Sequence, residues 1–154
     1  MNDSSFVHSF GFRLAHVARR LRQAVDDELR AYGLTDATWR PLAYVGRLGE
    51  GVRQKEVADA LGIQGPSLVR LLDTLERRGL IERREQKDDR RVRGIYLTQS
   101  GRKLQRRILR ISDSIQERVL RSADPDDLIA CMRLFDHVEH VLEQPVFDRK
   151  KDVI

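Results

Sequence analysis

Two short helical segments joined by a tight turn constrain the fold of this chain more than any other feature. Residues 54–61 place apolar side chains on one face, and Gly62 ends that segment. The turn occupies residues 62–65, and Pro66 stands where a first helical residue is expected, because its fixed φ suits that position. The second segment extends to about residue 78 and carries a leucine stripe, Leu68, Leu71, Leu72 and Leu75. The pattern predicts a helix-turn-helix.

A charged hairpin is predicted directly after the second helix. Residues 80–84 alternate weakly between apolar and polar, as a short half-buried strand does, and residues 93–97 are typical of the returning strand. The residues between the two strands are almost wholly charged or polar. The tip and its edge carry five charged side chains that we select as wing candidates: Lys87, Asp89, Arg90, Arg91 and Arg93.

Helical periods predict four longer helices that flank this unit, over about residues 10–29, 35–48, 99–121 and 125–142. Phe6 and Val7 precede the first of them and have no obvious local partner. Thr35 is the expected N-cap of the second, because Ser and Thr side chains accept hydrogen bonds from the free N–H groups at a helix start. A minimal strand is predicted near Val52.

The charge of the chain is unevenly distributed. The net charge is +5, with seven Lys and Arg against two Asp and Glu over residues 94–121, and four against eight over residues 122–154. A basic centre suits a polyanion such as nucleic acid. Judged on charge alone, a solvated helix face is the simpler interpretation.

The second helix of a helix-turn-helix enters the major groove of DNA with its N-terminal residues at the base edges. Ser67 can donate a hydrogen bond to a phosphate or a base, and Arg70 can contact guanine with two parallel bonds. In isolation, an ordinary amphipathic helix with an exposed Arg would look the same. The hairpin favours DNA binding, because an Arg of its tip can enter the minor groove while Asp89 orients it. The candidates on the recognition helix are Pro66, Ser67, Arg70 and Thr74.

The order of the elements predicts a mainly α-helical fold with a small β-hairpin wing. We expect a winged helix-turn-helix lobe for DNA binding and a helical dimerisation lobe. The chain would be a single domain over residues 1–154, with the DNA-binding lobe at about 34–98 and the helical dimerisation elements at about 6–32 and 99–147. The end helices carry apolar stripes that one small domain has little interior to cover, which favours a dimer.

Four segments of the chain carry a resemblance to a known family. They are Leu34-Thr35 with Trp39, Gly65-Pro66-Ser67-Leu68-Val69-Arg70 with Leu75-Glu76, Gly79-Leu80-Ile81, and Asp89-Arg90-Arg91 with Leu97-Thr98. At this spacing the chain resembles the MarR family of bacterial transcription regulators, and especially its SlyA-like branch. The resemblance spans roughly residues 10–145.

The resemblance implies a winged-helix homodimer that binds a pseudo-palindromic operator in double-stranded DNA, with repression as the commoner outcome. It places Arg91 in the minor groove with Arg90 as a companion, and Pro66, Ser67 and Arg70 at the operator. The first and last helices would build the dimer interface, which here gives Phe6, Phe10, Leu128, Phe135 and Leu142.

Many members of the family bind small aromatic carboxylates between the two lobes, and such binding weakens their affinity for DNA. By resemblance, Trp39 would line such a pocket, with His16 and Arg19 of the first helix as neighbours. Core packing is the simpler interpretation of Trp39, because a lone aromatic residue is more often core than ligand site.

Two weaker signals concern metal and redox chemistry. His137 and His140 lie three residues apart and share a helix face, so a metal-responsive regulator is an alternative, although no third ligand is obvious. Cys131 is the single cysteine, which excludes an intrachain disulfide. Its apolar neighbours predict a buried, inert thiol.

Other functional classes fit the sequence less well. The chain has no Gly-rich phosphate loop, nucleophile elbow or paired carboxylates in an apolar setting, so we expect no enzymatic activity and no cofactor. A helical protein-interaction module would not need the Arg-rich hairpin. An RNA-binding winged helix would use exposed aromatic side chains on which bases stack, and no such platform is apparent in the sequence. No signal peptide or apolar run of about 18 residues is visible, so we expect a cytoplasmic protein without a membrane partner.

Overall fold

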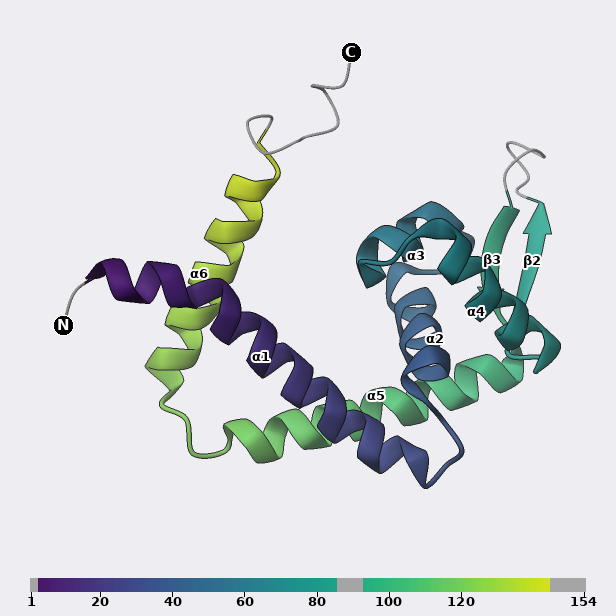
Figure 1. The fold of residues 1–154 in the computed structure, drawn as a ribbon. Helices are drawn as coiled ribbons and strands as arrows, with labels where there is room; N and C mark the ends of the chain where they lie inside the picture. The colour runs from purple at the N-terminus through teal and green to yellow at the C-terminus, as the bar shows by residue number, and fades with distance from the viewer. Residues whose placement is uncertain (1–2, 86–92, 145–154) are drawn as a thin grey trace, which may run out of the picture. The chain divides into compact units, whose positions relative to one another are not determined.

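The computed structural model describes residues 3–85 and 93–144, and Figure 1 shows how their helices and strands follow one another. The elements are α1 (Asp3–Arg30), α2 (Asp36–Leu48), β1 (Val52–Arg53), α3 (Gln54–Leu61), α4 (Gly65–Arg77), β2 (Ile81–Glu85), β3 (Arg93–Leu97), α5 (Gln99–Leu120) and α6 (Pro125–Leu142). The predicted fold class is confirmed, since the described residues are mostly helical with one small antiparallel sheet. Within these residues, no helix is both long and apolar enough to cross a membrane.

The chain divides into two compact units, and the boundary follows Gln116, inside α5. The first unit contains the helix-turn-helix where the sequence predicts it. α3 ends at Gly62, whose φ of +65° is the left-handed conformation that glycine adopts without steric cost. α4 begins at Gly65 after an N-cap at Gln64, so Pro66 is the second helical residue rather than the first. Both places suit a residue without an N–H, because the first turn has no backbone partner for it.

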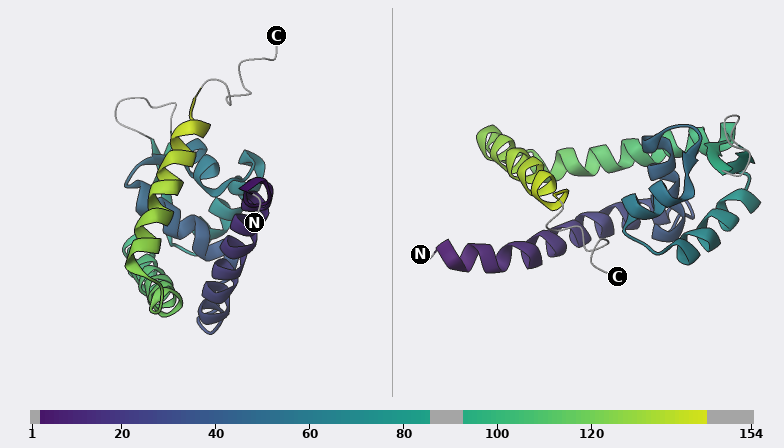
Figure 2. Two further views of the ribbon diagram at one scale, coloured as in Figure 1. Left: turned by 90° about the vertical axis from the view of Figure 1, so that its left-hand side faces the viewer. Right: turned by 90° about the horizontal axis from the view of Figure 1, so that it is seen from above.

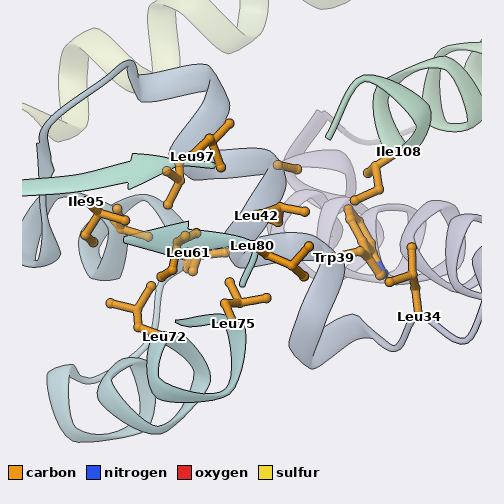
Figure 3. Packing of buried hydrophobic residues seen from close by; sticks show 14 of the residues in the cluster. Leu34, Trp39, Leu42, Leu61, Leu72, Leu75, Leu80, Ile95, Leu97 and Ile108 are labelled. Atoms are coloured by element: carbon orange, nitrogen blue, oxygen red, sulfur yellow. The ribbon is translucent and has the colours of Figure 1, made fainter. Parts of the chain in front are cut away.

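The leucine stripe of α4 lies at the centre of the core of the first unit. Leu68, Leu72 and Leu75 are fully buried, whereas Leu71 is only partly so. Figure 3 shows how this stripe meets side chains of α2, α3 and the strands. The fully buried partners include Leu42, Val57, Ile81 and Ile95. Because burying a leucine stabilises a fold by about 1.5–3 kcal/mol, this stripe fixes which face of α4 points outward.

The wing is the hairpin of β2 and β3, and β1 pairs with the other edge of β3. Ile81 pairs with Leu97 and Glu85 pairs with Arg93 in an antiparallel register. Ile81 is buried while Arg84 is exposed, which is the alternation of a strand with one covered face. The root of the wing and α4 therefore share one core.

α1 begins earlier than the sequence predicts. Phe6 and Val7 lie inside α1 rather than before it, and their side chains are 49% and 76% exposed. The apolar period marks only residues that share one face, and these two add no contact with the core of the unit. Once a helix is nucleated, each further residue adds a backbone hydrogen bond, so the helix extends beyond the stripe.

The threonines that precede α2 and α5 behave differently from one another. Thr35 precedes α2, but its hydroxyl makes no capping bond, and its carbonyl accepts the N–H of Trp39 at 2.9 Å. Thr98 Oγ1 accepts the N–H of Gly101 at 3.0 Å and donates to the carbonyl of Gly79 at 2.7 Å. Thr98 therefore ties the start of α5 to the loop between α4 and β2.

The second unit contains α6, which begins as its sequence predicts. Asp124 Oδ1 accepts the N–H of Asp126 at 2.8 Å, and Pro125 is the first helical residue. α6 is described throughout and buries none of its residues. Its apolar side chains Ile129, Met132 and Leu142 are 56%, 58% and 59% exposed. Cys131 is also exposed, so the prediction of a buried thiol is wrong for the single chain, because its apolar neighbours find no cover within the unit.

The start of α5 leaves room for glycine alone, since a Cβ atom at Gly101 would overlap the carbonyl oxygen of Leu80. We expect Gly101→Ala to lower the free energy of unfolding by about 1–3 kcal/mol, as overpacked sites do. Gly11→Ala is the matched control: Gly11 lies in α1 with nothing within 4 Å of its would-be Cβ, and the change should raise that energy by about 0.5–1 kcal/mol. Urea unfolding followed by circular dichroism measures both, and a Gly101→Ala variant as stable as the wild type would contradict the contact.

Candidate nucleic-acid interface

The outward face of α4 carries the side chains that the sequence assigns to DNA. Pro66, Ser67 and Arg70 are exposed, and Thr74 is half-buried. Ser67, Arg70 and Thr74 follow one another at steps of three and four, so they share the side of the helix opposite the buried leucines. The structure thus brings the predicted recognition-helix residues together on one face.

Arg77 extends this face, although it is not among the DNA-binding residues predicted from the sequence. Its Nη2 donates to Thr74 Oγ1 at 3.2 Å and its Nε lies 3.4 Å from the carbonyl oxygen of Asp73. Thr74 Oγ1 in turn donates to the carbonyl of Arg70 at 3.0 Å. Thr74 is therefore occupied by helix-internal contacts and holds Arg77 along the helix. The sequence does carry a signal for Arg77: the seven-residue step from Arg70 spans about two helical turns and places both side chains on the same face.

An ion-pair cluster joins α4 to the root of the wing, and it was not predicted from the sequence. The Nη2 of Arg83, in β2, pairs with Asp73 and lies 2.6 Å from Glu76 Oε2. The Nε of Arg83 donates to the same Oε2 at 3.0 Å, and its backbone N–H donates to Glu76 Oε1 at 3.1 Å. The Arg83 side chain is 20% exposed, so these bonds are partly shielded from water. No sequence signal shows this pairing, because the partners come from different elements.

The cluster shifts two pKa values toward the charged forms. The side-chain hydrogen bond from Arg83 holds the pKa of Glu76 below its usual value, against desolvation, which raises it. The same bond raises the pKa of Arg83, against desolvation, which lowers it. Both groups are therefore ionised at neutral pH.

A hollow of about 540 Å³ lies over this part of α4. It is lined by Arg70, Asp73, Thr74, Glu76, Arg77 and Arg83. Arg70 and Arg77 thus line the same hollow as the two carboxylates that Arg83 engages. Arg83 offsets part of the charge of the two carboxylates, and the three arginines of the hollow outnumber them, so its net charge is positive. A net positive surface suits a phosphate backbone or a base edge.

Most of the predicted wing tip lies outside the described residues. This holds for Lys87, Asp89, Arg90 and Arg91. Arg93 is described: it is the first residue of β3 and is exposed.

Arg84, on the exposed face of the wing, is engaged within the hairpin. Its Nη2 lies 2.5 Å from Glu82 Oε2, and its guanidinium lies 5.4 Å from the centre of the Tyr96 ring. These contacts leave Arg93 as the exposed cation nearest the tip among the residues described.

The basic centre of the sequence falls on two separate surfaces. The cations of residues 99–110 lie on α5, and Figure 2 shows α4 and α5 on different sides of α2. Arg102 pairs with Glu50 at 2.6 Å, and Arg107 lies 3.9 Å from the centre of the Tyr32 ring. The positive charge of residues 94–121 therefore lies mainly on α5 and adds little to the surface of α4 and the wing.

Trp39 lies in the core of the first unit, near Leu34 and Ile108 in Figure 3. Its Nε1 donates to Asp26 Oδ1 at 2.5 Å, which links α2 to α1. Core packing, the simpler interpretation of Trp39, agrees with this placement.

His16 and Arg19 lie together on the exposed part of α1. Arg19 Nη2 donates to His16 Nδ1 at 3.2 Å. They share a hollow of about 790 Å³ along α1, lined by Phe12, Arg13, Ala15, His16, Val17, Arg19 and Arg22. Trp39 is not among the lining residues, so the single chain does not bring the three predicted pocket residues together. Their shared pocket stays a prediction.

His137 and His140 lie on α6, as the sequence predicts. In the part of the chain that the structure describes, no three His, Cys, Asp or Glu residues are grouped so that they could hold a metal ion. The metal-responsive alternative therefore finds no ligand set among those residues.

Comparison with known proteins agrees with this geometry. The sequence model of the MarR family matches residues 32–92, which hold α2, the helix-turn-helix and the first strand of the wing. A MarR-family transcriptional regulator from Rhodococcus sp. RHA1 is 30% identical; the alignment covers 88% of this chain and 93% of that one, with a TM-score of 0.71. The chain belongs to the MarR family. Members of this family are transcription regulators with a winged-helix DNA-binding fold.

Two further solved structures extend the likeness of this MarR-family chain. The transcriptional regulator PA3341 is 34% identical, with 87% of this chain and 98% of that chain covered and a TM-score of 0.81. CouR from Rhodococcus jostii RHA1, solved with p-coumaroyl-CoA, is 31% identical, with 86% and 90% covered and a TM-score of 0.74.

The Arg83 cluster predicts a pH-dependent contribution to stability. The pKa of Glu76 is lowered in the folded chain, so its stabilisation is present above the ordinary pKa of 4.5 and is lost as pH falls through the folded value. We expect Glu76→Gln to cost up to about 1 kcal/mol at neutral pH, because the carboxylate is partly exposed and screened. The gap to wild type should close as the pH falls below the ordinary value of 4.5 and the Glu76 carboxylate takes up its proton. Thermal melts from neutral pH downward measure it, with Glu117→Gln on α5 as control, and a gap independent of pH would contradict the pairing.

Proposed function

We propose that this MarR-family chain is a repressor that binds a pseudo-palindromic operator as a homodimer. The observation that carries the proposal is the outward face of α4. Ser67, Arg70 and Arg77 lie there, opposite the buried side of the helix with Leu68, Leu72 and Leu75. The DNA-binding lobe would comprise about residues 34–98, with helical dimerisation elements at about 6–32 and 99–147. SlyA-like membership stays a prediction.

Each part of the interface has a distinct role in the proposal. The start of α4, with Pro66 and Ser67, would lie against the edge of the major groove, and Arg70 would read a guanine through two parallel hydrogen bonds. The wing would follow the backbone into the minor groove, through Lys87, Asp89, Arg90, Arg91 and Arg93. Arg77, further along α4, is placed for a phosphate contact, which positions the protein without reading sequence.

Arg70→Ala tests the reading of bases by α4. We expect it to weaken binding to the operator by about 1–3 kcal/mol and to relax one base preference, because a bidentate contact is lost. Arg106→Ala is the matched control, since Arg106 is an exposed cation on α5. Fluorescence anisotropy on the DNA upstream of the protein's own gene, at fixed salt, gives both affinities. Equal losses for the two variants would mean that α4 contributes only general positive charge.

The homodimer is supported by the apolar side chains that the single chain leaves uncovered. Ile129, Met132 and Leu142 on α6 are more than half exposed, as are Phe12 and Val17 on α1. Exposed apolar area of this extent on a small protein marks an association surface. Of the other residues assigned to the interface, Phe6 is exposed, whereas Phe10, Leu128 and Phe135 are partly buried within the chain.

Met132→Asp tests the dimer without touching the core of the first unit. We expect it to halve the molar mass measured by light scattering and to weaken operator binding, because a charge would have to be buried at the interface. Arg133→Ala, the next residue on the same helix, should leave the mass of the dimer unchanged. A Met132→Asp protein that remains a dimer would show that α6 does not form the interface.

A small effector is the last part of the proposal. CouR was solved with p-coumaroyl-CoA, and the hollow along α1 of this chain combines apolar Phe12 and Val17 with the cations Arg13, Arg19 and Arg22. Such a mixture suits a ligand with an aromatic body and an anionic group. We propose an aromatic carboxylate or its thioester as the effector, with His16 and Arg19 at its anionic group.

Release of operator DNA tests the effector. We expect p-coumarate or its coenzyme A thioester to release the DNA and to change the fluorescence of Trp39, the single tryptophan. Arg19→Ala should raise the concentration needed for half-release severalfold, because a charge-assisted bond is lost. Arg20→Ala is the control, since Arg20 is the exposed neighbour that does not line the hollow. Retention of DNA at saturating amounts of both compounds would refute this ligand class.

A further inference from the structure

Two carboxylates lie on the part of α4 that the proposed function turns toward DNA. Asp73 and Glu76 line the same hollow as Arg70 and Arg77. Unpaired, they would repel phosphate and lower the affinity for DNA. Arg83 contacts both of them, and it comes from β2 rather than from α4.

We infer that Arg83 is a positioning residue, which holds the wing at a fixed angle to the recognition helix so that both reach DNA together. The inference rests on the proposed docking of α4 and the wing. Arg83 does not contact DNA in this account. It acts through Asp73 and Glu76, and through the strand to which it belongs.

The geometry requires an arginine rather than any cation. The Nη2 reaches both carboxylates, while Nε makes a further bond of 3.0 Å to Glu76 and the backbone N–H makes one of 3.1 Å. A planar guanidinium offers donors in several fixed directions, whereas a lysine ammonium is a point charge on a flexible stem. A lysine at this place would keep the charge and lose the fixed angle.

The contact is placed to control the direction of the wing. Ile81, two residues before Arg83, is buried in the core, so β2 is anchored at that residue. Arg83 adds an anchor on α4, opposite the buried Ile95 of β3, so the hairpin is held to the recognition helix as well as to the core. The pairing of β2 with β3 extends this constraint toward the tip of the hairpin, because Arg83 pairs with Ile95 and Glu85 pairs with Arg93.

The experiment measures how far the wing contributes to operator binding with and without this contact. Arg93→Ala is made in the wild-type chain and in Arg83→Gln, and operator affinity is measured at fixed salt. We expect Arg93→Ala to weaken binding about fivefold in the wild type and less than about twofold in Arg83→Gln, because a pivoting wing has already lost its contact. Ser67→Ala is the matched control and should cost the same factor in both backgrounds, since Ser67 lies on α4 outside the hollow that Arg83 lines and α4 keeps its own buried stripe.

A variant that lacks all three charges separates position from charge. Asp73→Asn, Glu76→Gln and Arg83→Gln together remove the carboxylates and the guanidinium at once. If Arg83 served only to neutralise the carboxylates, this triple variant would bind DNA at least as tightly as the wild type, and the inference would be overturned. We expect it to bind more weakly than the wild type, and Arg83→Lys to fall between wild type and Arg83→Gln.

Hydrogen exchange without DNA keeps the inference testable on its own. Amides of β2 and β3 should exchange faster in Arg83→Gln, while the amides of α4 between Leu68 and Leu75 keep their protection. Unchanged exchange in the strands would overturn the role of Arg83. If strand exchange rises but Arg93→Ala has no effect on DNA binding in the wild type, the proposed wing contact fails while the anchoring by Arg83 stands.

Discussion

The burial of three leucines on α4 is the constraint on which the rest of the structure depends. Leu68, Leu72 and Leu75 are fully buried against α2, α3 and the strands, and this contact sets the rotation of α4 about its own axis. A helix buried along one stripe must present the opposite face to solvent. Arg70 and Arg77 are therefore displayed because of the core, before any ligand is considered.

The remaining contacts of the first unit tie other elements to this core. Trp39 of α2 bonds Asp26 of α1, and Arg107 of α5 stacks on Tyr32, which lies in the turn that follows α1. A hydrogen bond therefore holds α1 to α2, and a cation–π contact holds the turn after α1 to α5. Arg83 ties the wing to α4. An effector that displaces α1 would thus act on a helix that touches α2 directly, which gives a physical route from ligand to DNA-binding lobe.

The periodic features of this fold could be predicted from the sequence, and the contacts between elements could not. The α4 stripe, α3 and β3 were located to within about one residue, because their signals are local: leucines at helical spacing, Gly62, and the short apolar strand. The partners of Arg83 and Trp39 lie on other elements, so no spacing in the chain shows them. Cys131 was misjudged because its apolar neighbours were taken as a core, whereas α6 has no cover within one chain. The basic stretch of residues 94–121 likewise lies mainly on α5, which faces a different side from α4.

The most direct test of the account is an affinity ratio. The wild-type protein is titrated onto the DNA upstream of its own gene and onto a scrambled duplex of equal length, at one near-physiological salt concentration. The account predicts a preference of about a hundredfold or more for the upstream DNA, because reading bases adds to the shared attraction of the phosphates. Equal binding to the two duplexes would mean that α4 and the wing recognise only charge, and it would contradict the proposed reading of an operator in that DNA.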